Sequence, residues 1–241
     1  MVICKHSIQG WQIEAYTPKR NQKKPAMKRR KQSPVRRMAL YLVIPVILIG
    51  FSACRPVNPF QPVDPLVIPP MVDSVVNAVI EIPAGTNTKI EYDPVSGKFL
   101  PDLEGGAVRK VRFLPYPGNY GFIPNTLVSA AGGGDGDPLD VLVLSESRPT
   151  GSLIRCIPIA ALVMKDGGEL DTKIIAVPAD PADRLFDADN YLDFALEFEP
   201  AKRMIENWFV YYKGYNAVEL VGWEDGDFAM NEIKKWQILK K

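Results

Sequence analysis

The sequence predicts a mainly β fold with added helices (α+β), built as a small β-barrel with its helices packed outside. Short apolar or alternating runs fill the middle of the chain, and Gly, Pro and Asp residues separate them, as turns separate strands. Towards the C-terminus the apolar period becomes that of helices. Hydrophobic residues make up 46% of the 241 residues, which is sufficient for a globular core. Several short strands at close spacing are typical of a barrel or a sandwich.

The expected strands follow one another along the chain. They cover residues 75–82, 88–92, 108–114, 141–144, 153–164 and 173–177. Two helices follow, at 201–212 and 227–239, and Gly214 ends the first of them. At helical spacing, the first helix places on one face Met204, Ile205, Trp208, Phe209 and Tyr212. The second helix is expected to bury Met230, Ile233 and Trp236.

The net charge of +1 conceals two regions of opposite sign. Residues 1–53 carry 11 Lys and Arg against one acid, Glu14, so their charge is +10 and the remainder carries −9. An acidic body repels the phosphate backbone of nucleic acids. We therefore expect no nucleic-acid partner.

The basic N-terminal region resembles a secretory signal peptide of the bacterial lipoprotein type. A basic segment at 28–37 precedes an apolar run at 38–53, which is the order of a signal peptide. The run is short for a membrane-spanning helix and contains Pro45. It ends in FSAC, which resembles a lipoprotein box and predicts lipid attachment at Cys54. An uncleaved signal anchor and a cytoplasmic protein are the alternatives.

These features divide the chain into three parts. They are a leader with a signal peptide at 1–53, a lipidated Cys with a Pro-rich tether at 54–70, and a folded domain at 71–241. Six prolines within 55–70 favour extended polyproline conformations. The expected product is anchored to a membrane on its extracytoplasmic side. Translation could start at Met1, Met27 or Met38, and the lipoprotein interpretation favours Met27.

A run of carboxylates, GGGDGDPLDVLVL, leads directly into an apolar strand. Asp135, Asp137 and Asp140 repel one another unless a cation compensates their charge. They could form a solvated turn, because Gly, Asp and Pro all favour turns. They could also bind a metal ion, although Pro138 breaks the pattern of a calcium loop of the EF-hand type.

The other residue types narrow the choice of chemistry. The only His, His6, lies in the leader, and Cys156, the only Cys of the folded part, lies in an apolar run. Oxygen ligands without His or Cys favour Mg²⁺, Ca²⁺ or Mn²⁺ over zinc. A second acidic turn contains Asp166, Glu169 and Asp171, and by itself it is an ordinary hairpin turn. If both turns met at one rim of a barrel, they could hold several cations, as in two-metal phosphoryl transfer.

The segment GDGDPLDVLV resembles the signature of the family I soluble inorganic pyrophosphatases. Further matches occur in the family's order between 75 and 224: VIEIP followed by Lys89 and Glu91, NYGFIP, Asp166 with Asp171 and Lys173, Tyr212 with Lys213, and VGW. The resemblance implies a closed five-stranded OB-like barrel and usually a homo-oligomer. It also implies an inorganic diphosphatase that hydrolyses pyrophosphate to two orthophosphates with several Mg²⁺ ions, for which Mn²⁺ is a possible substitute.

The resemblance also implies a role for each matching residue. Asp137 is expected to deprotonate the attacking water, and Tyr120 to reach into the active site. Metal ligands are expected at Glu81, Asp135, Asp140, Asp166 and Asp171. Phosphate-binding residues are expected at Lys89, Arg109, Lys173, Tyr212 and Lys213. Arg112 is an alternative to Arg109, because the segment from Arg109 to Asn119 is one residue shorter than is usual in the family.

Two other functions stay open. A lipoprotein with this fold could bind Ca²⁺ or another cation without turnover. The loss of Asp137 or of the Lys and Tyr set would mark such a protein, and neither is lost. A phosphohydrolase could instead act on a different extracytoplasmic phosphoanhydride. A larger pocket near 214–218 would favour that alternative.

Overall fold

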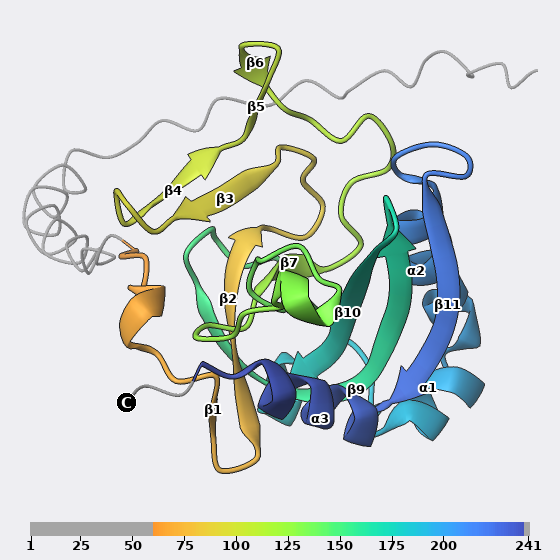
Figure 1. The fold of residues 1–241 in the computed structure, drawn as a ribbon. Coiled ribbons are helices and arrows are strands. Elements are labelled where there is room, and N and C mark those ends of the chain that lie inside the picture. The colour runs from red at the N-terminus through yellow and green to blue at the C-terminus, as the bar shows by residue number, and fades with distance from the viewer. Residues whose placement is uncertain (1–59, 239–241) are drawn as a thin grey trace, which may run out of the picture. The chain divides into compact units, whose positions relative to one another are not determined.

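The computed structural model describes residues 60–238, which are organised around a seven-stranded sheet (Figure 1). In spatial order its strands are β1 (Met71–Val72), β2 (Val75–Ile82), β7 (Asn119–Phe122), β8 (Asp140–Val143), β10 (Glu169–Pro178), β9 (Leu153–Asp166) and β11 (Val218–Asp225). Two hairpins stand apart from it, β3 (Ile90–Asp93) with β4 (Lys98–Pro101) and β5 (Leu103–Glu104) with β6 (Ala107–Val108). The helices are α1 (Tyr191–Leu196), α2 (Glu199–Tyr211) and α3 (Gly226–Trp236). The expectation of a mainly β fold with few helices is confirmed.

Strand β2 makes two sets of pairings. It pairs with β7 and also with the first residues of β9, so the pairings run from β2 through β7, β8, β10 and β9 back to β2. Strand β9 can join β2 and β11 along one edge because it is 14 residues long. The pair β8–β10 is parallel, whereas the other pairings of the sheet are antiparallel.

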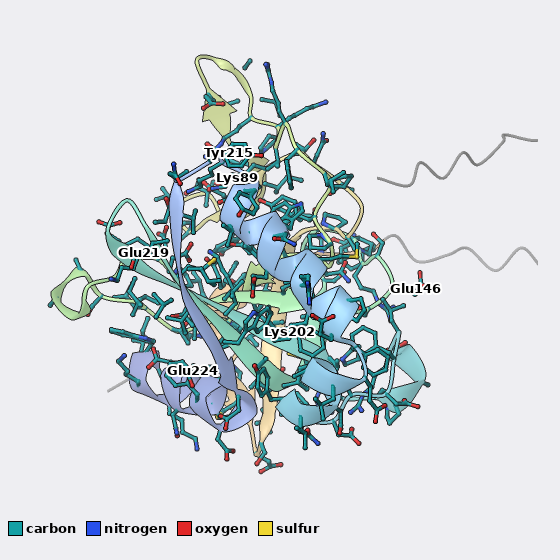
Figure 2. All side chains as sticks on the ribbon, turned by 90° about the vertical axis from the view of Figure 1, so that its right-hand side faces the viewer. Lys89, Glu146, Lys202, Tyr215, Glu219 and Glu224 are labelled. Atoms are coloured by element: carbon teal, nitrogen blue, oxygen red, sulfur yellow. The ribbon has the colours of Figure 1, made fainter. Side chains whose placement is uncertain are left out.

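Helices cover both hydrophobic clusters that the sheet helps to form. Helix α2 contributes Ile205, Trp208 and Phe209 to one cluster, and α3 contributes Ile233 and Trp236 to the other. Figure 2 looks onto α2, which lies beside β11, the edge strand of the sheet. These five side chains are buried, which confirms the expectation for Ile233 and Trp236, whereas Met230, also expected to be buried, is only partly buried.

Three expectations about elements are wrong or incomplete. Met204 is 69% exposed, because it lies on the solvent side of α2. Of residues 108–114 only Val108 is in a strand, since the chain there turns towards Pro115 and Pro117, which cannot donate to a ladder. Helix α1 and the strands β1, β4, β5, β7 and β11 were not expected.

The expected leader, signal peptide and lipidated Cys54 lie outside the described residues. Among the helices at 60–238, none is long and apolar enough to cross a membrane. Cys156 is buried in β9, and burial raises the pKa of its thiol to about 12. The thiolate therefore does not form at neutral pH, which agrees with a structural role for this residue.

Candidate active site

A cleft of about 700 Å³ opens where β8 and β10 begin and β9 ends. Every catalytic, phosphate-binding and metal-binding residue expected from the sequence lines it, except Arg109. These residues are Glu81, Lys89, Tyr120, Asp135, Asp137, Asp140, Asp166, Asp171, Lys173, Tyr212 and Lys213. The two acidic turns therefore meet at one end of the sheet, although 26 residues separate Asp140 from Asp166 in sequence.

The parallel pairing of β8 with β10 builds the centre of the cleft. It places Lys173 directly beside Asp140 on the neighbouring strand. Asp171 precedes Lys173 by two residues on β10, and residues two apart in a strand face the same side. Consequently the Lys173 ammonium group is paired with both carboxylates, and its Nζ lies 2.6 Å from Asp171 Oδ1.

Lys173 is a buried cation with a full set of partners. It is 5% exposed, and its Nζ also donates to the Tyr120 hydroxyl at 3.1 Å and lies over the Phe209 ring. Burial alone would lower the pKa of this lysine, but the Asp140 carboxylate and the other negative groups around it raise the pKa well above its usual range. The lysine therefore stays charged and holds Asp140 and Asp171 close together.

The loop before β8 presents its two carboxylates towards solvent. The Asp137 N–H donates to Asp135 Oδ1 at 2.9 Å. Between them Gly136 has φ +88°, a left-handed conformation that favours glycine. Partial burial and the Asp135 carboxylate raise the pKa of Asp137. Such a shift makes Asp137 a better proton acceptor than an ordinary surface aspartate.

Asp166 and Lys213 close the opposite side of the cleft. Asp166 ends β9, where Gly167 and Gly168 turn the chain into β10, and its carboxylate is paired with Lys213. Lys213 follows Tyr212, whose ring stacks on Trp208 with centroids 4.8 Å apart. The end of α2 thus fixes a tyrosine and a lysine at the mouth of the cleft.

Glu81 enters the cleft from an irregularity in β2. The register with β7 shifts between Ile80 and Ile82, so that Glu81 is the extra residue of a β-bulge. Its carboxylate accepts a hydrogen bond from the Tyr92 N–H at 2.7 Å. Burial raises the pKa of Glu81 to about 8. Without a bound metal ion, the Glu81 carboxyl group is therefore largely protonated at neutral pH.

The comparisons with known proteins agree on one family. The family model for inorganic pyrophosphatase matches residues 78–240. The chain belongs to the inorganic pyrophosphatase family. "Inorganic pyrophosphatase 1" of Pseudomonas syringae pv. tomato is 41% identical over 161 residues, 65% of this chain and 85% of that protein. The expectation that the chain is an inorganic diphosphatase is thereby confirmed.

Solved structures of pyrophosphatases share the fold. The inorganic pyrophosphatase from Thermus thermophilus has a TM-score of 0.61 and 33% identity, covering 72% of this chain and 97% of the other. A truncated vacuolar soluble pyrophosphatase of Trypanosoma cruzi, solved in complex with PPi, has a TM-score of 0.61 and 25% identity. The match covers 69% of this chain and 68% of the T. cruzi chain.

The donor chemistry of the cleft fits the metal dependence of pyrophosphatases. Six acidic residues expected as metal ligands or base line it, and no His or Cys does, which favours hard cations such as Mg²⁺. Within residues 60–238, however, no three acidic, His or Cys side chains are already arranged to hold an ion. Lys173 and Lys213 instead neutralise Asp140, Asp171 and Asp166. The lysine ammonium groups stand in for the positive charge that a metal ion would supply.

Neither candidate arginine lines the cleft of this pyrophosphatase. Arg109 is paired with Asp102 at 3.0 Å, and this hydrogen bond raises the pKa of its guanidinium group. Arg112 lines an adjoining cavity of about 470 Å³ together with Tyr212 and Lys213. Which arginine contacts phosphate stays a prediction.

Sequence reasoning missed part of the cleft wall. Tyr92, Pro65 and Leu66 also line it. The hydrogen bond from Tyr92 to Glu81 comes from the backbone, and a backbone donor leaves no signal in a sequence. Glu91 belongs to the VIEIP–Lys89 segment that matches the family, but its salt bridge to Lys89 at 2.7 Å was not expected.

Proposed function

We propose that this protein hydrolyses inorganic pyrophosphate to two orthophosphates with Mg²⁺ as its cofactor. The observation that carries the proposal is the convergence of the acidic residues with Lys89, Lys173, Lys213, Tyr120 and Tyr212 in one cleft. Pyrophosphate is a compact polyanion, so its site needs positive charge both from the protein and from bound cations. The complex of the T. cruzi relative with PPi is consistent with this substrate.

The chain's own residues divide the work of the reaction. Asp137 accepts a proton from the attacking water, whose oxygen bonds to one phosphorus as the bridging P–O bond breaks. The lysines and tyrosines bind the phosphoryl oxygens and stabilise the departing phosphate. Bound Mg²⁺ would be held by Glu81, Asp135, Asp140, Asp166 and Asp171, and it supplies charge neutralisation and a lowered pKa for coordinated water. In the loaded cleft, Lys173 and Lys213 would exchange carboxylate partners for phosphoryl oxygens.

The purified full chain provides the test. We expect phosphate release from pyrophosphate with Mg²⁺, none in EDTA, and at least a hundredfold loss of kcat in Asp137→Asn, the usual scale for a general base. Asp187→Asn is the control, because Asp187 is exposed and lies outside the cleft. A folded wild-type chain that released no phosphate in Mg²⁺ would refute the proposal.

A second candidate substrate is a phosphoanhydride with an organic substituent. The adjoining cavity shares Tyr212 and Lys213 with the cleft and adds Arg112, Phe113, Tyr211 and Tyr215. Aromatic side chains beside a cation suit a ring attached to a phosphate chain. If ADP were hydrolysed with a kcat/KM equal to or above that of pyrophosphate, this substrate class would replace the first.

We also propose that the enzyme is a lipoprotein tethered through Cys54 on the extracytoplasmic side of a membrane. The basic and apolar order of residues 28–53 and the FSAC box support this proposal. Cells fed labelled palmitate should incorporate the label into the wild-type protein and not into Cys54→Ala. The mass of the mature N-terminus would separate lipidation from an uncleaved signal anchor.

Two features of architecture complete the proposal. We propose a closed five-stranded OB-like barrel, and the cycle of pairings from β2 through β7, β8, β10 and β9 supports it. Family membership favours a homo-oligomer, and sedimentation of the purified chain in detergent would measure its state. Slow amide exchange along the β2–β9 seam would support closure, and exchange as fast as at the free edge of β1 would contradict it.

A further inference from the structure

The expected base, Asp137, lies in a loop whose sequence gives it little rigidity of its own. Four glycines occur within residues 132–136, and glycine leaves the backbone more freedom than any other residue. We call residues 128–137 the Asp137 loop. The Val128 N–H donates to the Asp137 carbonyl oxygen at 2.8 Å, and the Gly136 N–H donates to the Val128 carbonyl oxygen at 2.9 Å. The two ends of the loop are thus joined, whereas contacts from outside the loop fix its middle.

Helix α3 supplies the first outside contact through its last residue, Trp236. A Cβ atom on Gly132 would lie 2.3 Å from Trp236 Cη2, so the indole ring packs directly against the backbone of the loop. The Trp236 carbonyl oxygen also accepts from the Leu127 N–H at 2.9 Å, immediately before the loop begins. Trp236 therefore holds the Asp137 loop both at its start and in its middle.

The indole ring of Trp236 is itself fixed. Trp236 is 9% exposed and belongs to a buried hydrophobic cluster with Val128 and Ile233. Its Nε1–H donates to Glu232 Oε2 at 2.8 Å. Lys235 is paired with Glu232 at 3.0 Å, and its ammonium group lies over the indole ring. A side chain that packing and hydrogen bonds hold in one place can support a functional loop.

The second acidic turn supplies the other outside contact. The Leu170 N–H donates to the Gly133 carbonyl oxygen at 2.8 Å. Leu170 directly precedes Asp171, so this hydrogen bond joins the two acidic turns of the cleft. Because Gly133 directly follows Gly132, a shift of the loop at Trp236 would also disturb this hydrogen bond.

We propose that Trp236 is a positioning residue of the active site, which holds the Asp137 loop against the second acidic turn and thereby places Asp135 and Asp137. The inference deepens the proposed function and rests on it in assigning Asp137 to the attacking water and Asp135 to the metal. A misplacement of about 1 Å at a reacting group can cost about a hundredfold in rate. Since Trp236 acts through the loop backbone, we expect a smaller effect of about tenfold on kcat.

The effect should fall on kcat and not on KM. The lysines and tyrosines assigned to the phosphoryl oxygens line the cleft from elements outside the Asp137 loop. Substrate binding should therefore persist when the loop shifts, whereas the step that needs the base becomes slower. A purely structural role of Trp236 would lower stability without this division between kcat and KM.

An exchange of size at the contact provides the variants. Trp236→Phe removes the outer ring of the indole, which carries Cη2, and keeps an aromatic side chain in the cluster. Gly132→Ala adds a methyl group that would meet Cη2, and Gly132 has no left-handed conformation that would strain an alanine. In the combined variant the methyl group enters the space that the indole leaves. Phe194→Leu is the control, because Phe194 is fully buried in the other cluster and does not line the cleft.

Steady-state kinetics with pyrophosphate and Mg²⁺ are measured on the purified full chain, at a temperature at which circular dichroism shows every variant to be folded. We expect Trp236→Phe and Gly132→Ala each to lower kcat about tenfold at nearly constant KM. The combined variant should regain about threefold of that loss, because the two changes compensate at one contact. Phe194→Leu should lower Tm, as large-to-small core changes do, and leave kcat unchanged.

Mn²⁺ binding without pyrophosphate gives a readout that needs no turnover. Bound ion is followed by electron paramagnetic resonance. Residues that directly orient a metal ligand change metal affinity by about 10–100-fold. Because Trp236 reaches Asp135 through the loop backbone, Trp236→Phe and Gly132→Ala should each raise the Kd for Mn²⁺ by less, about threefold. Phe194→Leu should leave the Kd unchanged.

Three results would overturn the proposal. They are an unchanged kcat in both single variants, a loss of kcat in Phe194→Leu as large as in Trp236→Phe, and a combined variant in which the two losses simply multiply. If Trp236→Phe did not fold, Gly132→Ala would decide alone, because it changes an exposed position of the loop. If the wild-type chain released no phosphate, the proposed function would fail. An unchanged Kd for Mn²⁺ in both single variants would then still contradict the role of Trp236.

Discussion

At the scale of single residues, lysine side chains of the protein neutralise several of the carboxylates in the cleft. Lys173 is the most constrained of them, because it is 5% exposed and neutralises Asp140 and Asp171 together. Breaking a buried ion pair by removing one partner typically costs about 3–5 kcal/mol, since the remaining charge is left without compensation.

Lys173→Met should therefore lower the free energy of unfolding in EDTA by about 3–5 kcal/mol. Millimolar Mg²⁺ should restore part of the loss, because a divalent cation can compensate the same carboxylates. Urea denaturation followed by circular dichroism measures both effects. Lys165→Met is the control, since the pair of Lys165 with Glu219 is exposed and long, at 3.5 Å, and should contribute less than about 1 kcal/mol. Equal losses in the two variants would contradict the central role of Lys173.

Glu81 makes stability depend on pH in the metal-free protein. Its pKa is about 8 in the folded chain against an ordinary value of 4.5. The unfolded chain therefore releases this proton near pH 4.5, whereas the folded chain keeps it until about pH 8. The free energy of unfolding should fall as the pH rises through this window, and Glu81→Gln should remove that fall. Urea denaturation in EDTA at pH 5 and pH 8 tests this, and an unchanged pH dependence in the variant would disprove it.

The site could largely be predicted from sequence because its side chains belong to short motifs of fixed spacing. Asp135, Asp137 and Asp140 are such a case. What spacing could not reveal was the partner of each residue. The pair of Lys173 with Asp140 depends on the parallel register of β8 and β10, and the pair of Arg109 with Asp102 depends on the hairpin region outside the cleft. Long-range pairing of this kind leaves no local pattern.

At the scale of elements, the strands that were expected are those with continuous apolar or alternating runs. Strand β2 matches its expected bounds, because its side chains are buried from Val76 to Ile80. Strand β11 was missed because both of its faces carry acidic or exposed residues and its register shifts between Leu220 and Gly222. Short amphipathic signals of this kind are weak evidence for a strand.

The backbones of β2 and β7 approach each other closely at Gly121. A Cβ atom on Gly121 would lie 1.9 Å from the Val79 carbonyl oxygen, and backbone atoms cannot yield as a side chain does. Gly121→Ala should therefore lower the free energy of unfolding by about 3 kcal/mol or more. Gly97→Ala, with φ +67° but open space around it, should cost about 1 kcal/mol from backbone strain alone. Thermal unfolding compares the two, and equal costs would contradict the close approach of these strands.

At the scale of the whole molecule, the acidic charge of the chain after residue 53 is partly concentrated in one cleft. An ion that binds only the folded state stabilises it by about 2.7 kcal/mol at a concentration of 100 times its Kd. Saturating Mg²⁺ should therefore raise Tm by about 5–10 °C relative to EDTA. Calorimetry at constant ionic strength measures the shift, with Na⁺ as the control cation. A shift that survived in Asp140→Asn with Asp171→Asn would place the bound ion elsewhere.

The folded unit begins earlier in the chain than the sequence predicts, because residues 62–70 pack on it. The sequence placed the domain start at residue 71, because prolines dominate 55–70. In the structure, Pro65 and Pro70 are buried, the Val63 N–H donates to the Gly151 carbonyl oxygen at 3.0 Å, and the Asn77 side chain donates to the Pro69 carbonyl oxygen at 2.9 Å. Proline residues do not indicate whether a segment is a free linker or packs on the folded domain, because they restrict the backbone in the same way in both cases. A recombinant protein for biochemical work should therefore retain residues 60–70.

The position of Lys173 affects the order in which the enzyme folds and binds its metal ions. A cluster of carboxylates without internal positive charge would repel itself and would need metal in order to fold. With Lys173 already between Asp140 and Asp171, the chain can complete its core first and acquire its ions afterwards. Such a protein needs no metal ion in order to fold, and the supply of ions then decides when newly made molecules become active.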